Sequence, residues 1–467
     1  MWVMQDWMKV SRVACLCLLV GCGSVNENQT DAGAGDDASA GDAATIDAEP
    51  DAPPVACTET SCTNNTLSVC GTDGMVERTQ TCFLGCFDQT RCNAIDPSNG
   101  LASSVDQAAA QGDITLPDGT SINTDTGAVT GLQGTIAIAT STVAQAGGPS
   151  LRVLIAKSFT LGNVRVTGTL PLAMVASKDI TLQGVLDISA DGATFGAGAS
   201  GCASGNGSAP GGGNFSVIPA NNTGGYPHYL WTVNGAGGGG FGTAGGNGGL
   251  VTASFNVGAG GPANGIPTLV PLRGGCAGYA DVTLNRGAGG GAAQLVSNER
   301  IHLVNAGGSK GAIDASGGGG RAGALGREDL NATDPVYSAA GGGSGGAILL
   351  EAGSVVIDDG AGLLAGGGGG GGYGACTPAP SGADATTSSG AAAGGACVAA
   401  RPAAAGGAGS TTATGDVGGN SNATQGGAGG GGGGLGRIRI NTADGSVMTG
   451  GTSVLRGDRT TGTVGSR

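Results

Sequence analysis

Residues 341–374 read GGGSGGAILLEAGSVVIDDGAGLLAGGGGGGGYG, and this stretch decides the predicted fold. It holds a first apolar strand at residues 348–350, a corner of small residues, a second strand at 355–357 and a third apolar pair at 363–364. Apolar positions at a period of two are typical of short β-strands. These strands are too few and too short to form a core alone, so the stretch has to bury its apolar residues against similar segments.

The same pattern of apolar positions recurs elsewhere in the chain. Copies begin at Met174, Leu295 and Leu349, a shorter copy begins at Leu154, and a degenerate copy begins at Ile438. One repeated phrase of short strands predicts an all-β, single-stranded parallel β-helix, a solenoid whose coils bury a continuous apolar column. In this alignment Leu295 and Leu349 stack and both point into the column. The alternative fold is an antiparallel β-sandwich with long loops.

Long glycine-rich insertions separate the copies, at about residues 193–291, 317–346 and 366–434. All three leave the phrase at the same point, so they are expected on one side of the solenoid. Such runs could pack as extended polyglycine helices or stay mobile. We expect them to add little stability, because they bury few side chains and glycine loses much backbone entropy on ordering.

Glycine supplies 101 of the 467 residues, well above its usual share of about 7%. The Gly-Gly-Ala-Gly and Gly-Gly-Gly-Gly runs of the insertions resemble the glycine-rich repeats of PGRS-type bacterial surface proteins. The net charge of −14 argues against nucleic acid as a partner, since binding phosphates requires clustered Lys and Arg.

The N-terminus has the features of an export signal, predicted for residues 1–21, in which Lys9 and Arg12 precede a short apolar run. Leu19-Val20-Gly21-Cys22 resembles the bacterial lipobox. The resemblance implies cleavage before Cys22, a lipid on its sulfur and a membrane partner through that lipid. It also implies an exported protein in the outer membrane or at the cell surface. Residues 22–56 are acidic and poor in large apolar side chains, which predicts a disordered tether.

A six-cysteine module at residues 57–92 follows the tether, with residues 93–150 as the predicted cap and first coils and residues 151–467 as the solenoid. An even number of cysteines in a short exported segment predicts three disulfides of open connectivity. No metal is expected, because the module has neither His nor a CxxC pair. The module resembles Cys-rich mini-domains of glycine-rich bacterial surface proteins. Its cysteines are Cys57, Cys62, Cys70, Cys82, Cys86 and Cys92.

Four more cysteines lie in the insertions. Cys202 and Cys276 fall in the first insertion, and Cys376 and Cys397 fall in the third. We expect one disulfide within each pair, because exported cysteines at even count are usually oxidised.

Few residues in the sequence are candidates for catalysis or ligand binding. Asp187 and Asp314 occupy matching positions in two copies, and stacked coils would place them in a carboxylate ladder. No Arg or Lys stands beside them in the aligned phrases. Tyr226, Tyr229 and Trp231 could form a platform for stacking sugars. No catalytic residue, metal site or cofactor is predicted.

These features favour a surface-anchored lipoprotein with a structural or adhesive role and no catalysis, with cell-surface polysaccharide or protein as its partner. The alternative is a carbohydrate-binding or carbohydrate-cleaving β-helix protein that uses the stacked carboxylates.

Overall fold

A computed structural model of the chain describes most residues after the predicted tether, and these belong to one compact unit at residues 54–467. The predictions for residues 1–53 lie outside the described residues. No helix in the described part is long and apolar enough to span a membrane. The described residues are 55–132, 138–199, 234–251, 258–280, 286–323, 338–373, 381–386, 390–396, 404–411, 414–420 and 427–467.

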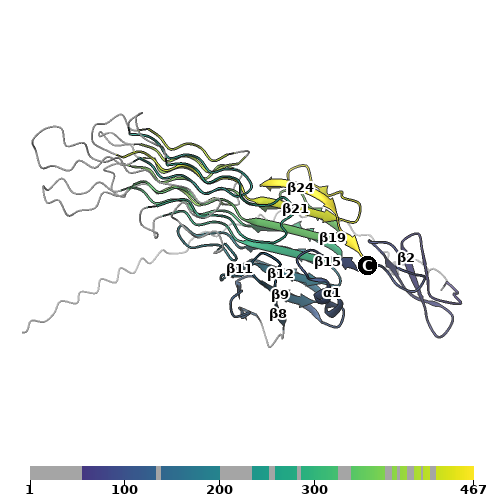
Figure 1. Cartoon of the computed structure of the whole chain (residues 1–467). Helices are drawn as coiled ribbons and strands as arrows, with labels where there is room; N and C mark the ends of the chain where they lie inside the picture. The colour runs from purple at the N-terminus through teal and green to yellow at the C-terminus, as the bar shows by residue number, and fades with distance from the viewer. Residues whose placement is uncertain are drawn as a thin grey trace, which may run out of the picture. The chain divides into compact units, whose positions relative to one another are not determined.

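The fold is mainly β, with two large sheets whose strands are mostly parallel (Figure 1). The first sheet has 11 strands: in order β24 (Asp458–Thr463), β21 (Arg437–Thr442), β19 (Ala347–Ile357), β15 (Ala292–Leu303), β12 (Leu172–Ala176), β9 (Leu151–Ala156) and β8 (Ala139–Val143), and beside them β5 (Asp113–Leu116), β10 (Ser158–Leu161), β13 (Ile180–Leu182) and β22 (Met448–Thr449). The second has seven, in the order β23 (Val454–Arg456), β20 (Gly362–Leu364), β18 (Ala312–Asp314), β14 (Val185–Asp187), β11 (Val164–Thr167), β6 (Thr120–Asn123) and β7 (Val129–Thr130).

Two short antiparallel pairs and one helix complete the elements after the Cys-rich module. Strand β16 (Asn305–Ala306) pairs with β17 (Ser309–Lys310), and β4 (Ile95–Asp96) pairs with β25 (Gly465–Ser466). Helix α1 (Ala102–Ala108) buries Val105 and Ala108 in a second apolar cluster on the first sheet.

Stacked apolar residues form the main core, as the repeated phrase predicts. Phe159, Ile180, Ile301 and Val355 are successive register partners on β10, β13, β15 and β19, and each is almost fully buried. Burying one such side chain stabilises the fold by about 1.5–3 kcal/mol relative to leaving it exposed. The parallel strand pairing also excludes the alternative antiparallel sandwich.

The predicted solenoid is wrong in one respect, because the sheets are not closed into a solenoid. Strand β14 ends at Asp187, and the next long strand, β15, begins only at Ala292. A closed coil needs a short return from one sheet to the other. In this chain a long glycine-rich insertion follows β14 in place of such a short return.

The predicted register of the third copy is also wrong by one residue. Leu295 pairs with Leu350, whereas Leu349 pairs with Gln294. A register irregularity between Ser297 and Arg300 on β15 absorbs the extra residue. Since side chains alternate between the two faces of a strand, this shift turns Leu349 away from the main core and into the second cluster, to which α1 also contributes.

The described parts of the glycine-rich insertions are extended segments that lie side by side, which we call the glycine bundle (Figure 1). In residues 341–346 the backbone N–H groups donate in turn to segments 276–279, 431–434 and 315–318, and then repeat that order. A three-residue turn without internal hydrogen bonds is the geometry of a polyproline II-type helix. Of the two possibilities for the insertions, the described segments therefore adopt the packed one.

Glycine is required in this bundle because the backbones touch. A Cβ on Gly343 would lie 1.9 Å from the carbonyl oxygen of Ala288, and one on Gly341 would lie 2.0 Å from that of Gly237. The segments are also largely buried, and their polar backbone groups bond to one another. The expectation that the insertions add little stability therefore overlooked backbone packing and hydrogen bonding, which need no side chains.

The Cys-rich module holds a three-stranded antiparallel sheet of β1 (Ser61–Thr63), β2 (Thr66–Cys70) and β3 (Val76–Thr81). Its three predicted disulfides are present, and their connectivity is now defined as Cys57–Cys70, Cys62–Cys86 and Cys82–Cys92.

Candidate acidic site on the second sheet

One row of residues crosses the second sheet on the face opposite the main core and carries charges of both signs. Arg165 on β11 pairs in register with Asp187 on β14, and Asp187 pairs with Asp314 on β18. The row continues through Leu364 on β20 to Arg456 on β23. Residues on either side of this row point into the main core, so alternation places the charged side chains on the opposite face.

Asp187 lies in a close ion pair at the centre of this row. An Nη of Arg165 donates to Oδ2 of Asp187 at 2.6 Å, and the Ser189 hydroxyl donates to Oδ1, also at 2.6 Å. The side chains of Arg165 and Asp187 are each 35% exposed, so the pair is open to solvent.

Asp314 is the more buried carboxyl, at 6% exposed. Burial raises the pKa of Asp314 to about 6, opposed by hydrogen bonding from Ser316, and the neighbouring Asp187 raises it further. The backbone N–H of Ser316 donates to Oδ1 of Asp314 at 2.9 Å. Two adjacent carboxyls therefore have different environments, one ion-paired and one desolvated.

A segment of the glycine bundle, residues 381–386, forms the far wall of this site. Oδ1 of Asp384 accepts hydrogen bonds from the backbone N–H groups of Gly192 at 3.1 Å and Gly319 at 2.6 Å, which holds the segment in place. Between the segment and the sheet lies an open pocket of about 480 Å³. It is lined by Arg165, Asp187, Ser189, Ala190, Asp191, Asp314, Asp384, Ala385 and Thr386.

Two charged residues of this site, Arg165 and Asp384, were missed from the sequence. The absence of a nearby Arg or Lys, inferred from the aligned phrases, is wrong, since Arg165 contacts Asp187. The sequence did contain a signal for Arg165. Val164-Arg-Val166 follows the shorter copy of the repeat in the same way that Val185-Leu-Asp187 follows the next copy, so the two segments could have been aligned. Asp384 had no such signal, because it lies in a glycine-rich insertion.

Several predicted site residues lie outside the described residues: Cys22, Cys202, Tyr226, Tyr229, Trp231, Cys376 and Cys397. Cys276 is buried and disulfide-bonded, and its predicted partner Cys202 is among those not described. His302 on β15 is half-buried and lies 3.0 Å from Oδ1 of Asp358. That contact holds the pKa of Asp358 below its usual value.

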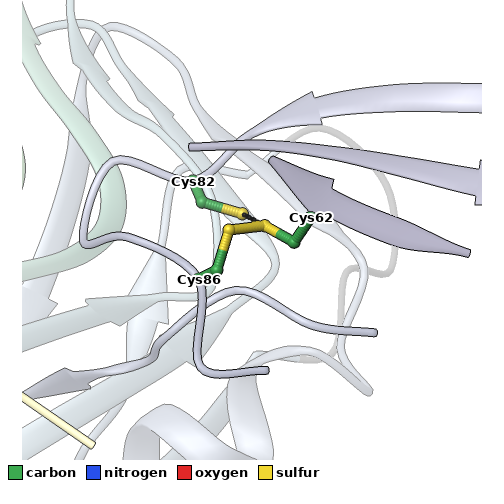
Figure 2. A group of neighbouring side chains, drawn as sticks. All are labelled: Cys62, Cys82 and Cys86. Carbon is green, nitrogen blue, oxygen red and sulfur yellow. Dashed lines mark hydrogen bonds between the residues drawn. A yellow bond between two sulfur atoms is a disulfide. The ribbon is translucent and has the colours of Figure 1, made fainter. Parts of the chain in front are cut away.

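The Cys-rich module contains a second group of potential ligand atoms (Figure 2). The sulfurs of Cys62, Cys82 and Cys86 all lie within 4.8 Å of one another. Each of these sulfurs belongs to a disulfide. Metal ions bind cysteine as the thiolate, so the group in this state is not a metal site.

The chain matches no known protein family, no curated protein and no solved structure. The resemblance to PGRS-type surface proteins thus rests on the composition of the insertions alone. Function has to be inferred from the chain's own residues.

Proposed function

We propose that this chain is a surface-anchored lipoprotein with a structural or adhesive role. The observation that carries the proposal is the glycine bundle, whose segments hydrogen-bond to one another at a three-residue period. Backbone pairing of this kind restrains the described segments, which suits a rigid support better than a flexible linker.

Two further features support a location of this protein outside the cell. Three disulfides within residues 57–92 suit an oxidising compartment. The lipobox-like Leu19-Val20-Gly21-Cys22 and the acidic tether behind it would link the described unit to a lipid surface.

Replacing Cys22 by Ala tests the anchor. We expect the Cys22→Ala protein to lose incorporation of labelled fatty acid, and either to leave the membrane fraction or to keep its signal uncut, because no sulfur remains to accept the lipid. The matched control is Cys17→Ala, which removes a thiol of the same signal segment but not the one at the expected cleavage site. Processing and membrane retention of Cys22→Ala at the wild-type level would refute the lipoprotein assignment.

A second candidate function, carbohydrate cleavage, is favoured by the acidic site. A glycoside-cleaving pair needs one carboxyl that is protonated and one carboxylate. The desolvated Asp314 suits the acid, and the ion-paired Asp187 suits the carboxylate. The open pocket between them and Asp384 is polar, as a saccharide site requires.

Turnover of a panel of acidic and neutral polysaccharides, with and without calcium, tests this candidate. If the site is catalytic, Asp187→Asn and Asp314→Asn should each lower kcat at least about 100-fold, the lower end of general acid–base contributions. The reaction should be fastest below pH 6 and slow about tenfold per unit above it, because the acid with a pKa of about 6 must be protonated. The control is Asp113→Asn, an exposed carboxylate on β5. If no polysaccharide of the panel is turned over, the cleavage function is refuted and the structural or adhesive role remains as the proposal.

A further inference from the structure

Two disulfides of the Cys-rich module are in direct contact. The sulfur of Cys62, bonded to Cys86, lies 3.5 Å from the sulfur of Cys82 (Figure 2). Cys82 is in turn bonded to Cys92. This separation is near van der Waals contact, so a thiolate at either sulfur would already face the other disulfide. The remaining disulfide, Cys57–Cys70, is not part of this group of sulfurs.

The other two cysteines of the pair also face each other. Cys86 and Cys92 form an isolated antiparallel bridge. The flanking hydrogen bonds run from Phe87 N–H to Arg91 C=O and from Asn93 N–H to Gly85 C=O, so Cys86 and Cys92 occupy a non-hydrogen-bonded position. At such positions the Cα atoms are about 4.5 Å apart, which is within the range that a disulfide can span.

We propose that these two disulfides are an exchange pair, which a small-molecule thiol converts from Cys62–Cys86 and Cys82–Cys92 to Cys62–Cys82 and Cys86–Cys92. Both partners of each new bond are already neighbours, so the exchange needs side-chain rotation and little backbone movement.

Three thiolate attacks complete the exchange without net oxidation or reduction. The external thiolate attacks Cys92, forms a mixed disulfide there and releases Cys82 as a thiolate. Cys82 attacks Cys62, forms Cys62–Cys82 and releases Cys86. Cys86 then attacks the mixed disulfide at Cys92, forms Cys86–Cys92 and releases the external thiolate. The thiol is regenerated and acts as a catalyst.

The exchange changes what the 85–93 hairpin is tied to. In the described connectivity Cys86 links this hairpin to β1, and Cys92 links it to the residue that follows β3. After exchange the hairpin is cross-linked only to itself, while β1 is bonded to Cys82. The small-molecule thiol would thereby release the hairpin from its disulfide links to the module's sheet.

Disulfide mapping of the intact protein tests the proposal. The protein is incubated with a catalytic amount of a small thiol, quenched with acid, alkylated, digested and analysed by mass spectrometry. We expect peptides linked through Cys62–Cys82 and Cys86–Cys92 to appear together, with Cys57–Cys70 unchanged. Their rate should rise about tenfold per pH unit below about pH 8, because the attacking species is a thiolate. Persistence of only the original pairs, under conditions in which the thiol forms mixed disulfides, would overturn it.

Paired variants provide an independent measurement. Cys86→Ser with Cys92→Ser leaves Cys62 and Cys82, and Cys62→Ser with Cys82→Ser leaves Cys86 and Cys92. Each remaining pair should be found as a disulfide in the folded, air-oxidised protein. The control, Cys57→Ser with Cys70→Ser, should still exchange. Free thiols at both remaining pairs in protein that melts normally would contradict the proposal, and misfolding of the variants leaves the wild-type mapping to decide.

Discussion

Gly343→Ala is expected to lower the free energy of unfolding by about 3 kcal/mol, within the range for overpacking a close-packed interior. The added Cβ would lie 1.9 Å from the carbonyl oxygen of Ala288. The colliding atom belongs to the backbone, so no side-chain rotation relieves the contact. Relief requires two segments of the glycine bundle to separate, which also weakens the hydrogen bond from Gly343 N–H to Gly318 C=O. Thermal and denaturant unfolding measure the loss.

Gly390→Ala is the matched control. A Cβ there meets no atom within 4 Å, and Gly390 is exposed. The same chemical change should leave stability unaltered or raise it by up to about 1 kcal/mol, because alanine restricts the unfolded chain. Hydrogen exchange gives a second measurement, since amides of residues 341–346 should be protected in the wild type and exchange faster in Gly343→Ala. Equal melting temperatures for the two variants would show that the bundle is not packed as described.

Glu351→Ala is expected to destabilise the protein by about 3–5 kcal/mol, because it leaves several buried donors without an acceptor. Glu351 lies on β19 and is 1% exposed. Its carboxylate accepts hydrogen bonds from the Ser98 N–H at 3.0 Å, the Ser98 hydroxyl at 2.8 Å, Gln294 Nε2 at 2.7 Å and Asn441 Nδ2 at 3.1 Å. One side chain thus joins β15, β19 and β21 to the segment before α1.

Two further variants distinguish the loss of this hydrogen-bond network from the general effect of removing a glutamate. Glu351→Gln keeps the size but turns one acceptor into a donor that faces other donors, so we expect an intermediate loss of about 1–3 kcal/mol. Glu77→Ala, on the exposed side of β3, should change stability by less than about 0.5 kcal/mol. Chemical denaturation of the three variants provides the measurement, and a Glu351→Ala loss as small as that of Glu77→Ala would rule out the network.

The strands and the Cys-rich disulfides were predictable because their signals are local. Apolar residues at a period of two mark each strand, and one repeated phrase indicates parallel stacking of its copies. The same logic placed Asp187 and Asp314 at matching positions, and their strands pair in that register. The predicted alignment was wrong at Leu349, because the register irregularity between Ser297 and Arg300 does not change the spacing of apolar residues in the sequence.

The sequence by itself therefore determined the strand segments, their parallel stacking and the presence of three disulfides. Only the tertiary structure decided the open sheets, the packing of the insertions and the far wall of the acidic site. Glycine has no side chain, so a glycine run carries no periodicity that could reveal its neighbours. Its packing depends on which backbone carbonyl occupies the space a Cβ would fill, as Ala288 does at Gly343. Asp384 reaches the pocket for the same reason: the backbone contacts that position it, to Gly192 and Gly319, exist only after the insertions have packed.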